Sequence, residues 1–224
     1  MKEAIVLAGG FGTRLKSVVS DVPKPMAPIN NKPFLEYILN YLQKNEINRV
    51  ILSVGYKWEI IKNYFGDRFK NIELVYSIED KPLGTGGAIK KALDLVKNKE
   101  IFVLNGDTFF DIKLQSMELE DSKILIALKK MINVNRYGAV KIDDNNYITS
   151  FVEKQFFKEC FINGGIYLLK ENIFDGFDLD EKFSFEDFLS KNFKKLKAKG
   201  SVFNDYFIDI GIPKDYKRVQ EDLK

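Results

Sequence analysis

An apolar run, Ala4–Leu7, leads into a glycine-rich loop that ends at Arg14, and this order is suited to binding phosphate. The run has the composition of a short buried strand, and glycines follow it at positions 9, 10 and 12. Glycine lets backbone N–H groups approach an anion closely, and the planar guanidinium of Arg14 adds parallel donors. Further on, Pro23 and Pro25 flank Lys24 and predict a stiff, extended segment that presents its ammonium group. These residues together predict a cradle for a phosphorylated ligand.

The loop differs from two common phosphate-binding motifs. The third glycine of the dinucleotide-binding fingerprint is missing after Gly10 and Gly12, and no Gly-Lys-Ser/Thr sequence follows. A tight connection after a strand uses glycines in the same way, so the glycines alone leave both interpretations open.

The order of further motifs resembles the sugar-1-phosphate nucleotidyltransferases, which join a nucleoside triphosphate to a sugar 1-phosphate and release pyrophosphate. The similarity is carried by LAGGFGTR (7–14), DVPKPMAPI (21–29), PLGTGGAI (82–89), NGD (105–107), FVEK (151–154), NGGIY (163–167) and DIGIP (209–213). It therefore extends along nearly the whole chain. The amino-acid sequences of these motifs most resemble those of the D-glycero-D-manno-heptose 1-phosphate guanylyltransferases of bacterial surface-glycan synthesis.

This resemblance implies roles for particular residues. Catalysis would fall to Arg14, Lys24 and Asp107. The nucleotide would contact Leu7, Ala8, Gly9, Gly10, Gly12, Thr13, Glu79, Gly84 and Thr85, and the loop at residues 84–87, which opens a helix with an electropositive amino-terminal end, would close over the base. The sugar phosphate would contact Tyr137, Gly138, Glu153, Lys154 and Asn163. A carboxylate at Glu79 would accept the N–H donors of guanine.

Two aspartates follow predicted strands and are candidate metal ligands. Asp107 comes after the strand-like run 101–104, and Asp209 comes after residues 206–208. Aspartate also caps turns, so spacing alone leaves both roles open; the family resemblance assigns both residues to Mg²⁺, with Asp111 as an alternative ligand. Two carboxylates crowded together without a cation repel each other, so we expect strain in the metal-free site and neutral or stabilising Asp→Asn substitutions there.

Composition excludes several other kinds of chemistry. The chain has no histidine and one cysteine, which excludes Ser-His-Asp and Cys-His catalysis, histidine-based metal sites and an internal disulfide. A net charge of +3, spread over mixed lysines and acids, gives no indication of nucleic acid binding. No run reaches the roughly 18 apolar residues of a membrane span, and Met1 enters the first strand without room for a signal peptide. We expect a cytoplasmic protein with no nucleic acid or membrane partner.

The residues leave the substrates open. GTP with a heptose 1-phosphate is the leading expectation, and mannose, glucose or N-acetylmuramate 1-phosphate with UTP, CTP or another triphosphate is the alternative. A non-catalytic subunit that senses nucleotide sugars is a third interpretation, although it would not need to retain Arg14, Lys24, Asp107 and Asp209. A homo-oligomer is compatible with each of these.

Apolar patterning predicts one α/β domain over residues 1–224. Strand patterns at 4–7, 49–54, 72–77 and 101–104 alternate with helical patterns at 34–42, 58–65 and 86–96, which requires parallel strands with right-handed crossovers. After residue 111 the strand patterns lie at 124–128, 139–142, 148–153 and 165–169, with helices at 185–193 and 213–223. We assign residues 1–111 to a nucleotide-binding half and 112–224 to a sugar-binding half. The family's fold is a Rossmann-like three-layer α/β/α arrangement with a mostly parallel central sheet, and ligands would lie over the carboxyl ends of its strands.

Overall fold

The fold is built on one sheet that both halves of the chain share. The computed structural model describes residues 2–10 and 22–223, and its main sheet has the order β11-β10-β12-β7-β1-β4-β6-β5, with β9 on β12 and β13 on β9. The strands of this sheet are β1 (Glu3–Leu7), β4 (Arg49–Val54), β5 (Arg68–Phe69), β6 (Ile72–Ile78), β7 (Glu100–Asn105), β9 (Ile124–Val134), β10 (Ala139–Ile142), β11 (Ile148–Val152), β12 (Phe157–Lys170) and β13 (Lys199–Phe203). Two small ribbons pair β2 (Pro28–Ile29) with β3 (Lys32–Pro33), and β8 (Thr108–Phe110) with β14 (Phe207–Asp209). The helices are α1 (Phe34–Lys44), α2 (Trp58–Phe65), α3 (Gly84–Leu93), α4 (Phe185–Asn192) and α5 (Pro213–Asp222).

Four parallel strands form the nucleotide-binding half of this sheet. Their order is β7-β1-β4-β6, so the chain moves outward from β1 to β6 and then returns through α3 to the other side of β1. The strand order therefore reverses between β1 and β7. Ligands bind at such reversals in open α/β sheets, because the flanking connections diverge there and leave a crevice.

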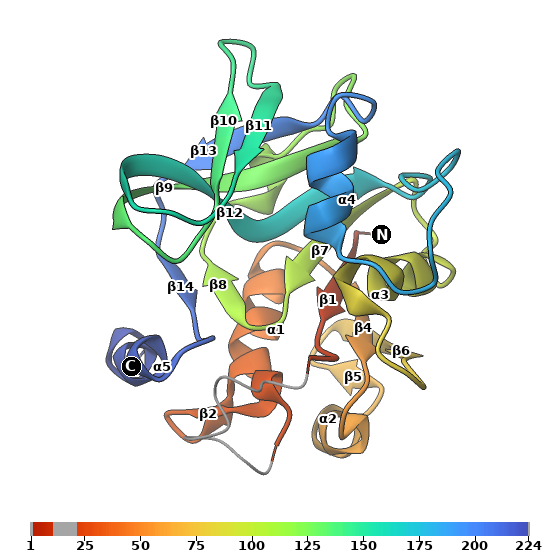
Figure 1. Ribbon diagram of the computed structural model, residues 1–224. Helices are drawn as coiled ribbons and strands as arrows, with labels where there is room; N and C mark the ends of the chain where they lie inside the picture. Colours follow the sequence, from red (N-terminus) through yellow and green to blue (C-terminus); the bar gives the residue numbers. More distant parts are fainter. Residues whose placement is uncertain (1, 11–21, 224) are drawn as a thin grey trace.

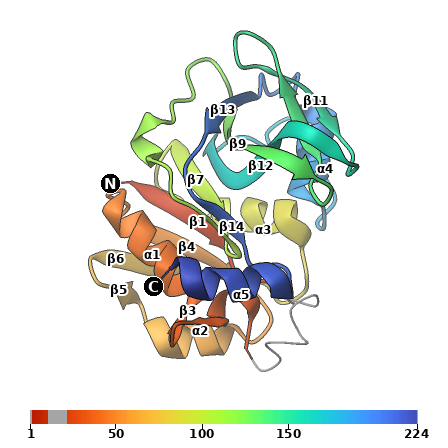
Figure 2. The same ribbon diagram turned by 90° about the vertical axis from the view of Figure 1, so that its left-hand side faces the viewer.

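Alternating side chains along the parallel strands divide the core into two layers. On β1, Ala4 and Val6 join one buried cluster with α1, α2 and α5, whereas Ile5 joins another with α3 and α4. Figure 2 shows α1 and α3 on opposite sides of β1. Successive side chains of a strand point to opposite faces, so strands covered on both faces read as continuous apolar runs. The predicted three-layer α/β/α fold with parallel strands at its centre is confirmed.

The sugar-binding half is mostly antiparallel, with β13 parallel to β9, and two of its strands, β9 and β12, are longer than predicted. Strand β12 pairs antiparallel with β7, β9 and β10, and in Figure 1 β9, β10 and β12 lie above β1, β4 and β6. Strands β9 and β12 run past the predicted segments into a ribbon where Lys130 faces Phe161 and Glu159 faces Ile132. That ribbon mixes exposed residues, such as Lys130, Ile132 and Glu159, with partly buried ones, so it lacks the continuous apolar run on which the prediction relied.

The connection at Lys24 also differs from its prediction. Lys24–Met26 forms a single 3₁₀ turn in which the N–H of Ala27 donates to the carbonyl of Lys24, so the lysine does not lie on an extended segment. Pro25 occupies an early position of this turn, where its fixed φ is tolerated and no N–H is needed. Within residues 2–10 and 22–223, no helix is long and apolar enough to cross a membrane.

Candidate active site

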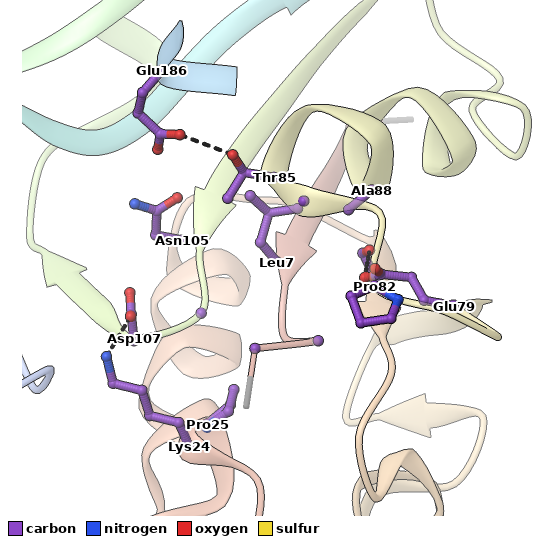
Figure 3. A pocket seen from close by; sticks show the side chains of 15 residues that line it. Leu7, Lys24, Pro25, Glu79, Pro82, Thr85, Ala88, Asn105, Asp107 and Glu186 are labelled. Carbon is purple, nitrogen blue, oxygen red and sulfur yellow. Dashed lines mark hydrogen bonds and ion pairs between the residues drawn. The ribbon is translucent and has the colours of Figure 1, made fainter. Parts of the chain in front are cut away.

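A cavity of about 420 Å³ opens where the strand order reverses. Strands β7, β1 and β4 end there in one row, with Leu7 paired to Asn105 on one side and Ser53 on the other. Figure 3 shows these strand ends with Lys24 and Asp107 at one side of the opening and Glu79 at the other. The residues that line the cavity are Leu7, Gly9, Gly10, Lys24, Pro25, Ser53, Glu79, Pro82, Gly84, Thr85, Ala88, Asn105, Gly106, Asp107 and Glu186.

Most described residues of the predicted nucleotide site lie on this cavity. Ala8 is the exception, because it is buried behind the wall and its N–H donates to the carbonyl of Ser53. The predicted residues Gly12, Thr13 and Arg14 lie outside the described residues. The cavity therefore brings together the start of the glycine-rich loop, Lys24 and the loop before α3.

Close backbone approach explains two of the glycines. A Cβ on Gly106 would lie 2.4 Å from the carbonyl oxygen of Leu7, to which the Gly106 N–H donates. A Cβ on Gly9 would lie 2.5 Å from Oε1 of Glu79. Glycine at these positions lets the ends of β1 and β7 touch and leaves room for a carboxylate beside the first loop.

Glu79 is fixed at the cavity by contacts from two elements. Its Oε2 accepts the N–H of Leu83 at 3.0 Å, and its Oε1 lies 3.4 Å from the hydroxyl of Ser53. The carboxylate therefore stands next to Gly9 with acceptor capacity left on both oxygens. A group with two N–H donors in one plane is the ligand that such a carboxylate recognises best.

Two backbone N–H groups in the first turn of α3 have a partner from the sugar-binding half. The N–H of Gly86 donates to the carbonyl of Phe183 at 3.0 Å, and the N–H of Gly87 lies 3.4 Å from the same oxygen. The hydroxyl of Thr85 donates to Glu186 and accepts the N–H of Phe185, both at 2.8 Å. A segment of the sugar-binding half therefore occupies two backbone donors of this electropositive helix end, a contact that the sequence analysis did not predict.

Lys24 and Asp107 lie at one side of the cavity, and Asp209, the second predicted metal ligand, lies next to them outside its lining. Lys24 Nζ is 2.5 Å from Asp107 Oδ2 (Figure 3). The N–H of Ile210 donates to the carbonyl of Asp107, and Asp209 pairs with Thr108 in the β8–β14 ribbon. A Cβ built on Gly211 would lie 2.7 Å from Asp209 Oδ1 and 3.1 Å from Lys24 Nζ. Two carboxylates far apart in the sequence thus face one region of space.

Asp209 has a second group of partners at its other oxygen. Asp209 Oδ2 accepts from the hydroxyl of Tyr137 at 3.2 Å and from Arg136 Nη2 at 3.4 Å, while Oδ1 accepts the N–H of Gly211 at 2.7 Å. Burial, reinforced by the neighbouring negative charge of Asp209, raises the pKa of Tyr137. The phenol therefore remains protonated at neutral pH and donates to the carboxylate.

The donor set at this place fits a hard divalent cation. Asp107 and Asp209 supply carboxylate oxygens, and the described residues around the cavity add no sulfur or imidazole ligand. No group of three or more acidic or cysteine side chains with metal-binding geometry occurs within residues 2–10 and 22–223. Mg²⁺ often takes one or two protein carboxylates and completes its shell with water and substrate phosphates, which matches two aspartates close to a cavity of about 420 Å³.

The predicted sugar-phosphate residues do not gather in one place. Tyr137 lines a separate cavity of about 430 Å³ that also contains Asp209. Glu153 and Lys154 are exposed in the connection between β11 and β12 and line neither cavity. Gly138 makes a close contact, since a Cβ there would lie 2.7 Å from the carbonyl of Val152.

Asn163, the last predicted sugar-binding residue, stabilises an irregularity in β12. Its amide donates to the hydroxyl of Tyr167 at 2.8 Å, and its Oδ1 accepts the N–H of Gly165, where φ is +74°. The pairing of β12 with β9 shifts register between Asn163 and Tyr167. In this structure the side chain of Asn163 is thus engaged with its own strand.

The sequence analysis missed several residues that line these two cavities, among them Asn105, Glu186 and Arg136. Asn105 belongs to a recognised motif but was given no role of its own, and Glu186 lies in the first turn of the predicted helix 185–193, with no motif of its own. The N-cap of α4 can be recognised in the sequence, because Ser184, whose side chain accepts the N–H of Asp187, begins an S-x-x-D pattern. Arg136 directly precedes the Tyr-Gly segment, but an arginine in a basic chain carries no signal until its partners are known.

Comparison with known proteins assigns the chain to a family. The profile of the nucleotidyl transferase family matches residues 3–224. The chain is 60% identical, over 96% of each sequence, to D-glycero-alpha-D-manno-heptose 1-phosphate guanylyltransferase of Campylobacter jejuni. It is 50% identical to the protein of the same description in Aneurinibacillus thermoaerophilus, over 99% of this chain and 98% of that one.

A solved structure agrees in fold and in extent. HddC from Yersinia pseudotuberculosis, crystallised as a complex with GMP-PN, has a TM-score of 0.87 and 41% sequence identity, and the similarity covers 100% of both chains. The cavity at the strand reversal, the converging aspartates and the match over nearly every residue lead to one conclusion: this chain belongs to the nucleotidyl transferase family.

Proposed function

We propose that this protein transfers GMP from GTP to D-glycero-D-manno-heptose 1-phosphate, forming GDP-heptose and releasing pyrophosphate. The observation that carries the proposal is 60% identity over 96% of the chain to a guanylyltransferase for this sugar phosphate. The cavity supports it, because Lys24, Asp107 and Glu79 lie on one opening at the strand reversal. The product would serve surface-glycan synthesis in the cytoplasm, a compartment that suits a chain with one cysteine.

The proposed chemistry needs charge neutralisation more than proton transfer. An oxygen of the sugar phosphate attacks the α-phosphorus of GTP in line, and the bond to the leaving pyrophosphate breaks. A phosphate monoester is already ionised near neutral pH, so a chain without histidine lacks nothing that this step requires. Positioning and electrostatic stabilisation supply most of the rate in such transfers.

Among the basic side chains that the structure describes, Lys24 is the best placed to neutralise phosphate charge. Its ammonium group lies on the cavity wall and contacts Asp107, which holds it at the opening. There it would touch the α-phosphate or the incoming sugar phosphate, while Arg14 would bind the triphosphate and the departing pyrophosphate. Both roles rest on the position of these residues in the family's motifs.

Asp107 and Asp209 would hold Mg²⁺ in the working enzyme. When bound, Mg²⁺ supplies neutralisation of the phosphate oxygens that gain charge during transfer. The residues of this chain supply the two carboxylates from adjoining ends of β7 and β14, and Arg136 and Tyr137 hold one of them in place.

Glu79 would select the base. Guanine presents its N1–H and its 2-amino group side by side, and the fixed carboxylate of Glu79 can accept both. Uracil and cytosine do not present this pair of donors. We therefore assign the preference for GTP to Glu79, whose Oε2 is anchored by Leu83 N–H.

The activity is tested by pyrophosphate release from purified protein with Mg²⁺, using four nucleoside triphosphates against heptose, mannose, glucose and N-acetylmuramate 1-phosphates. GTP with the heptose 1-phosphate should give the highest kcat/KM. A higher kcat/KM for UTP or CTP with a hexose 1-phosphate would contradict the proposed substrates, but it would agree with the assignment to the nucleotidyl transferase family. If no pair of substrates released pyrophosphate, the proposed nucleotidyltransferase activity itself would be contradicted.

The role of Glu79 is tested by Glu79→Gln with GTP and ITP, which lacks the 2-amino group. Loss of a charge-assisted hydrogen bond should lower kcat/KM for GTP by about 10- to 100-fold and reduce the preference for GTP over ITP. Asp80→Asn is the matched control, because Asp80 is the exposed neighbour with an ion pair to Lys91. Equal losses for both nucleotides would assign Glu79 to holding the loop and not to reading guanine.

A further inference from the structure

Asp209 belongs to a cluster of four side chains that lies between three elements. We call Arg136, Tyr137, Asp209 and Asp215 the Arg136 cluster. Arg136 comes from the connection between β9 and β10, Asp209 ends β14, and Asp215 lies in the first turn of α5. The guanidinium contacts Asp209 Oδ2 through Nη2 at 3.4 Å and Asp215 Oδ2 through Nη1. One planar cation thus bridges two acids from different elements.

Tyr137 closes the cluster. Arg136 Nη2 donates to the Tyr137 hydroxyl, which donates in turn to Asp209 Oδ2 at 3.2 Å, and the guanidinium lies 4.8 Å from the centre of the Tyr137 ring. Asp209 Oδ2 therefore receives two donors, whereas Oδ1 receives only the N–H of Gly211 among the described residues. The Arg136 cluster therefore donates hydrogen bonds to Oδ2 of Asp209, whereas Oδ1 keeps one lone pair for another ligand.

Asp209 Oδ1, which accepts one hydrogen bond, lies near Lys24, the cation that pairs with Asp107. Asp209 Oδ1 and Lys24 Nζ both lie within 3.1 Å of the point where a Cβ on Gly211 would stand. Lys24 is nevertheless paired with Asp107, at 2.5 Å, and not with Asp209. Each acid thus has its own cation: Lys24 for Asp107 and Arg136 for Asp209.

We propose that Arg136 is a positioning residue that keeps Asp209 away from Lys24 and aimed at the metal. The inference rests on the Mg²⁺ site of the proposed function. Without Arg136 the carboxylate of Asp209 loses its cation and turns to Lys24, which removes a ligand from the metal and a cation from the substrate phosphates. Lysine at position 136 would not replace it, because a single ammonium cannot span Asp209 and Asp215 as the guanidinium fork does.

The test measures Mn²⁺ binding to the full-length protein without substrates, by electron paramagnetic resonance. Groups that orient a metal ligand typically change metal affinity by 10- to 100-fold when they are removed, so Arg136→Met should weaken Mn²⁺ binding by about that factor, and Arg136→Lys should stay weak. Lys214→Met is the matched control, because Lys214 is an exposed cation on the wall of the same cavity. It removes the same charge and should leave Mn²⁺ affinity unchanged.

The direction of the change distinguishes positioning from simple repulsion. If Arg136 acted on the metal only through its positive charge, its removal would strengthen Mn²⁺ binding, and unchanged or tighter binding by Arg136→Met overturns the inference. Should Arg136→Met not fold, Asp215→Asn tests the same point, because it frees one end of the guanidinium and should weaken binding in the same direction.

A double substitution separates this inference from the proposed metal site. In an Asp209→Asn background, Arg136→Met should cause no further loss, whereas an equal loss in both backgrounds overturns the inference. Asp209→Asn alone should weaken Mn²⁺ binding. Wild-type affinity in Asp209→Asn would overturn the metal site and the inference with it; weak binding there, with wild-type affinity in Arg136→Met, overturns the inference alone.

Discussion

Lys24 Nζ lies 2.5 Å from Asp107 Oδ2, although the two residues are 83 positions apart in the chain. The lysine belongs to the turn that follows the glycine-rich loop, and the aspartate follows β7. The ammonium side chain is only 11% exposed. The sequence-based premise of two carboxylates without a cation is therefore wrong, because Lys24 and Arg136 already neutralise Asp107 and Asp209.

Asp107→Asn should therefore destabilise the metal-free protein, and not leave it neutral or more stable. The substitution leaves the Lys24 ammonium group without its charged partner in a mostly enclosed place, which costs about 1–2 kcal/mol of the free energy of unfolding after allowance for the partial exposure of Asp107. Urea denaturation in EDTA measures this loss. The same variant should have almost no turnover with Mg²⁺, since it removes a proposed ligand.

Asp111→Asn is the control for Asp107→Asn. Asp111 lies 3.9 Å from the exposed Lys44 and lines neither cavity described above. Its substitution should change stability by less than about 0.5 kcal/mol and leave turnover intact. An Asp107→Asn protein that is as stable as the wild type in EDTA would show that the Lys24 contact contributes nothing to folding.

Gly84→Ala should destabilise the protein by more than its backbone conformation alone explains. Gly84 has a φ of +71°, and a Cβ there would lie 2.5 Å from the carbonyl oxygen of Phe183. Gly176 has a φ of +77° and no atom within 4 Å of the corresponding point, so Gly176→Ala carries the conformational cost without the clash. That cost is about 1–2 kcal/mol, and the clash should add about 1–3 kcal/mol.

The comparison of these two alanine variants by urea denaturation isolates the contact between the α3 loop and the 181–184 segment. Because this contact also carries Thr85 and Glu186, Gly84→Ala should raise KM for the triphosphate, whereas Gly176→Ala should not. Equal losses of stability would mean that the segment moves aside without cost.

Tyr167 should make the protein sensitive to alkaline pH. The side chain is fully buried, and burial raises the pKa of its phenol in the folded state. A raised folded-state pKa gives stability that is complete below the unfolded value near 10 and is lost as the pH rises above it. The free energy of unfolding should therefore fall above pH 10, by up to about 1.4 kcal/mol per pH unit for each such tyrosine.

Tyr167→Phe checks the assignment, because it removes this ionisation. Urea denaturation between pH 9 and 11 should show a shallower decline for the variant, and the wild-type tyrosinate absorbance at 295 nm should rise together with unfolding. An unchanged slope would place the alkaline sensitivity on other groups, such as Tyr41, whose pKa burial also raises.

The local pattern of apolar residues was sufficient to predict the strands and helices of the nucleotide-binding half. Strands such as β4 read as continuous apolar runs because both of their faces are buried, and α1 shows a helical stripe because only one face is buried. The motif order was sufficient to place Lys24, Glu79 and Asp107 at one site, because residues after parallel strands meet at the same sheet edge.

Partners that are distant in the chain could be found only in the tertiary structure. Nothing near Gly86 indicates that the carbonyl of Phe183 occupies the donors of α3, since that contact forms only when the two halves meet. The long β9–β12 ribbon was underestimated because its exposed residues lack the apolar pattern that burial imposes.

The cations that pair with Asp107 and Asp209 also separate what the sequence determines from what the tertiary structure determines. The sequence alone determined that any metal would be held by oxygen ligands, because the chain has no histidine and one cysteine. Only the tertiary structure decided which cation stands beside each carboxylate, since Lys24 and Arg136 come from different halves of the chain. Charge pairing depends on distances of a few ångströms, and chain folding sets those distances.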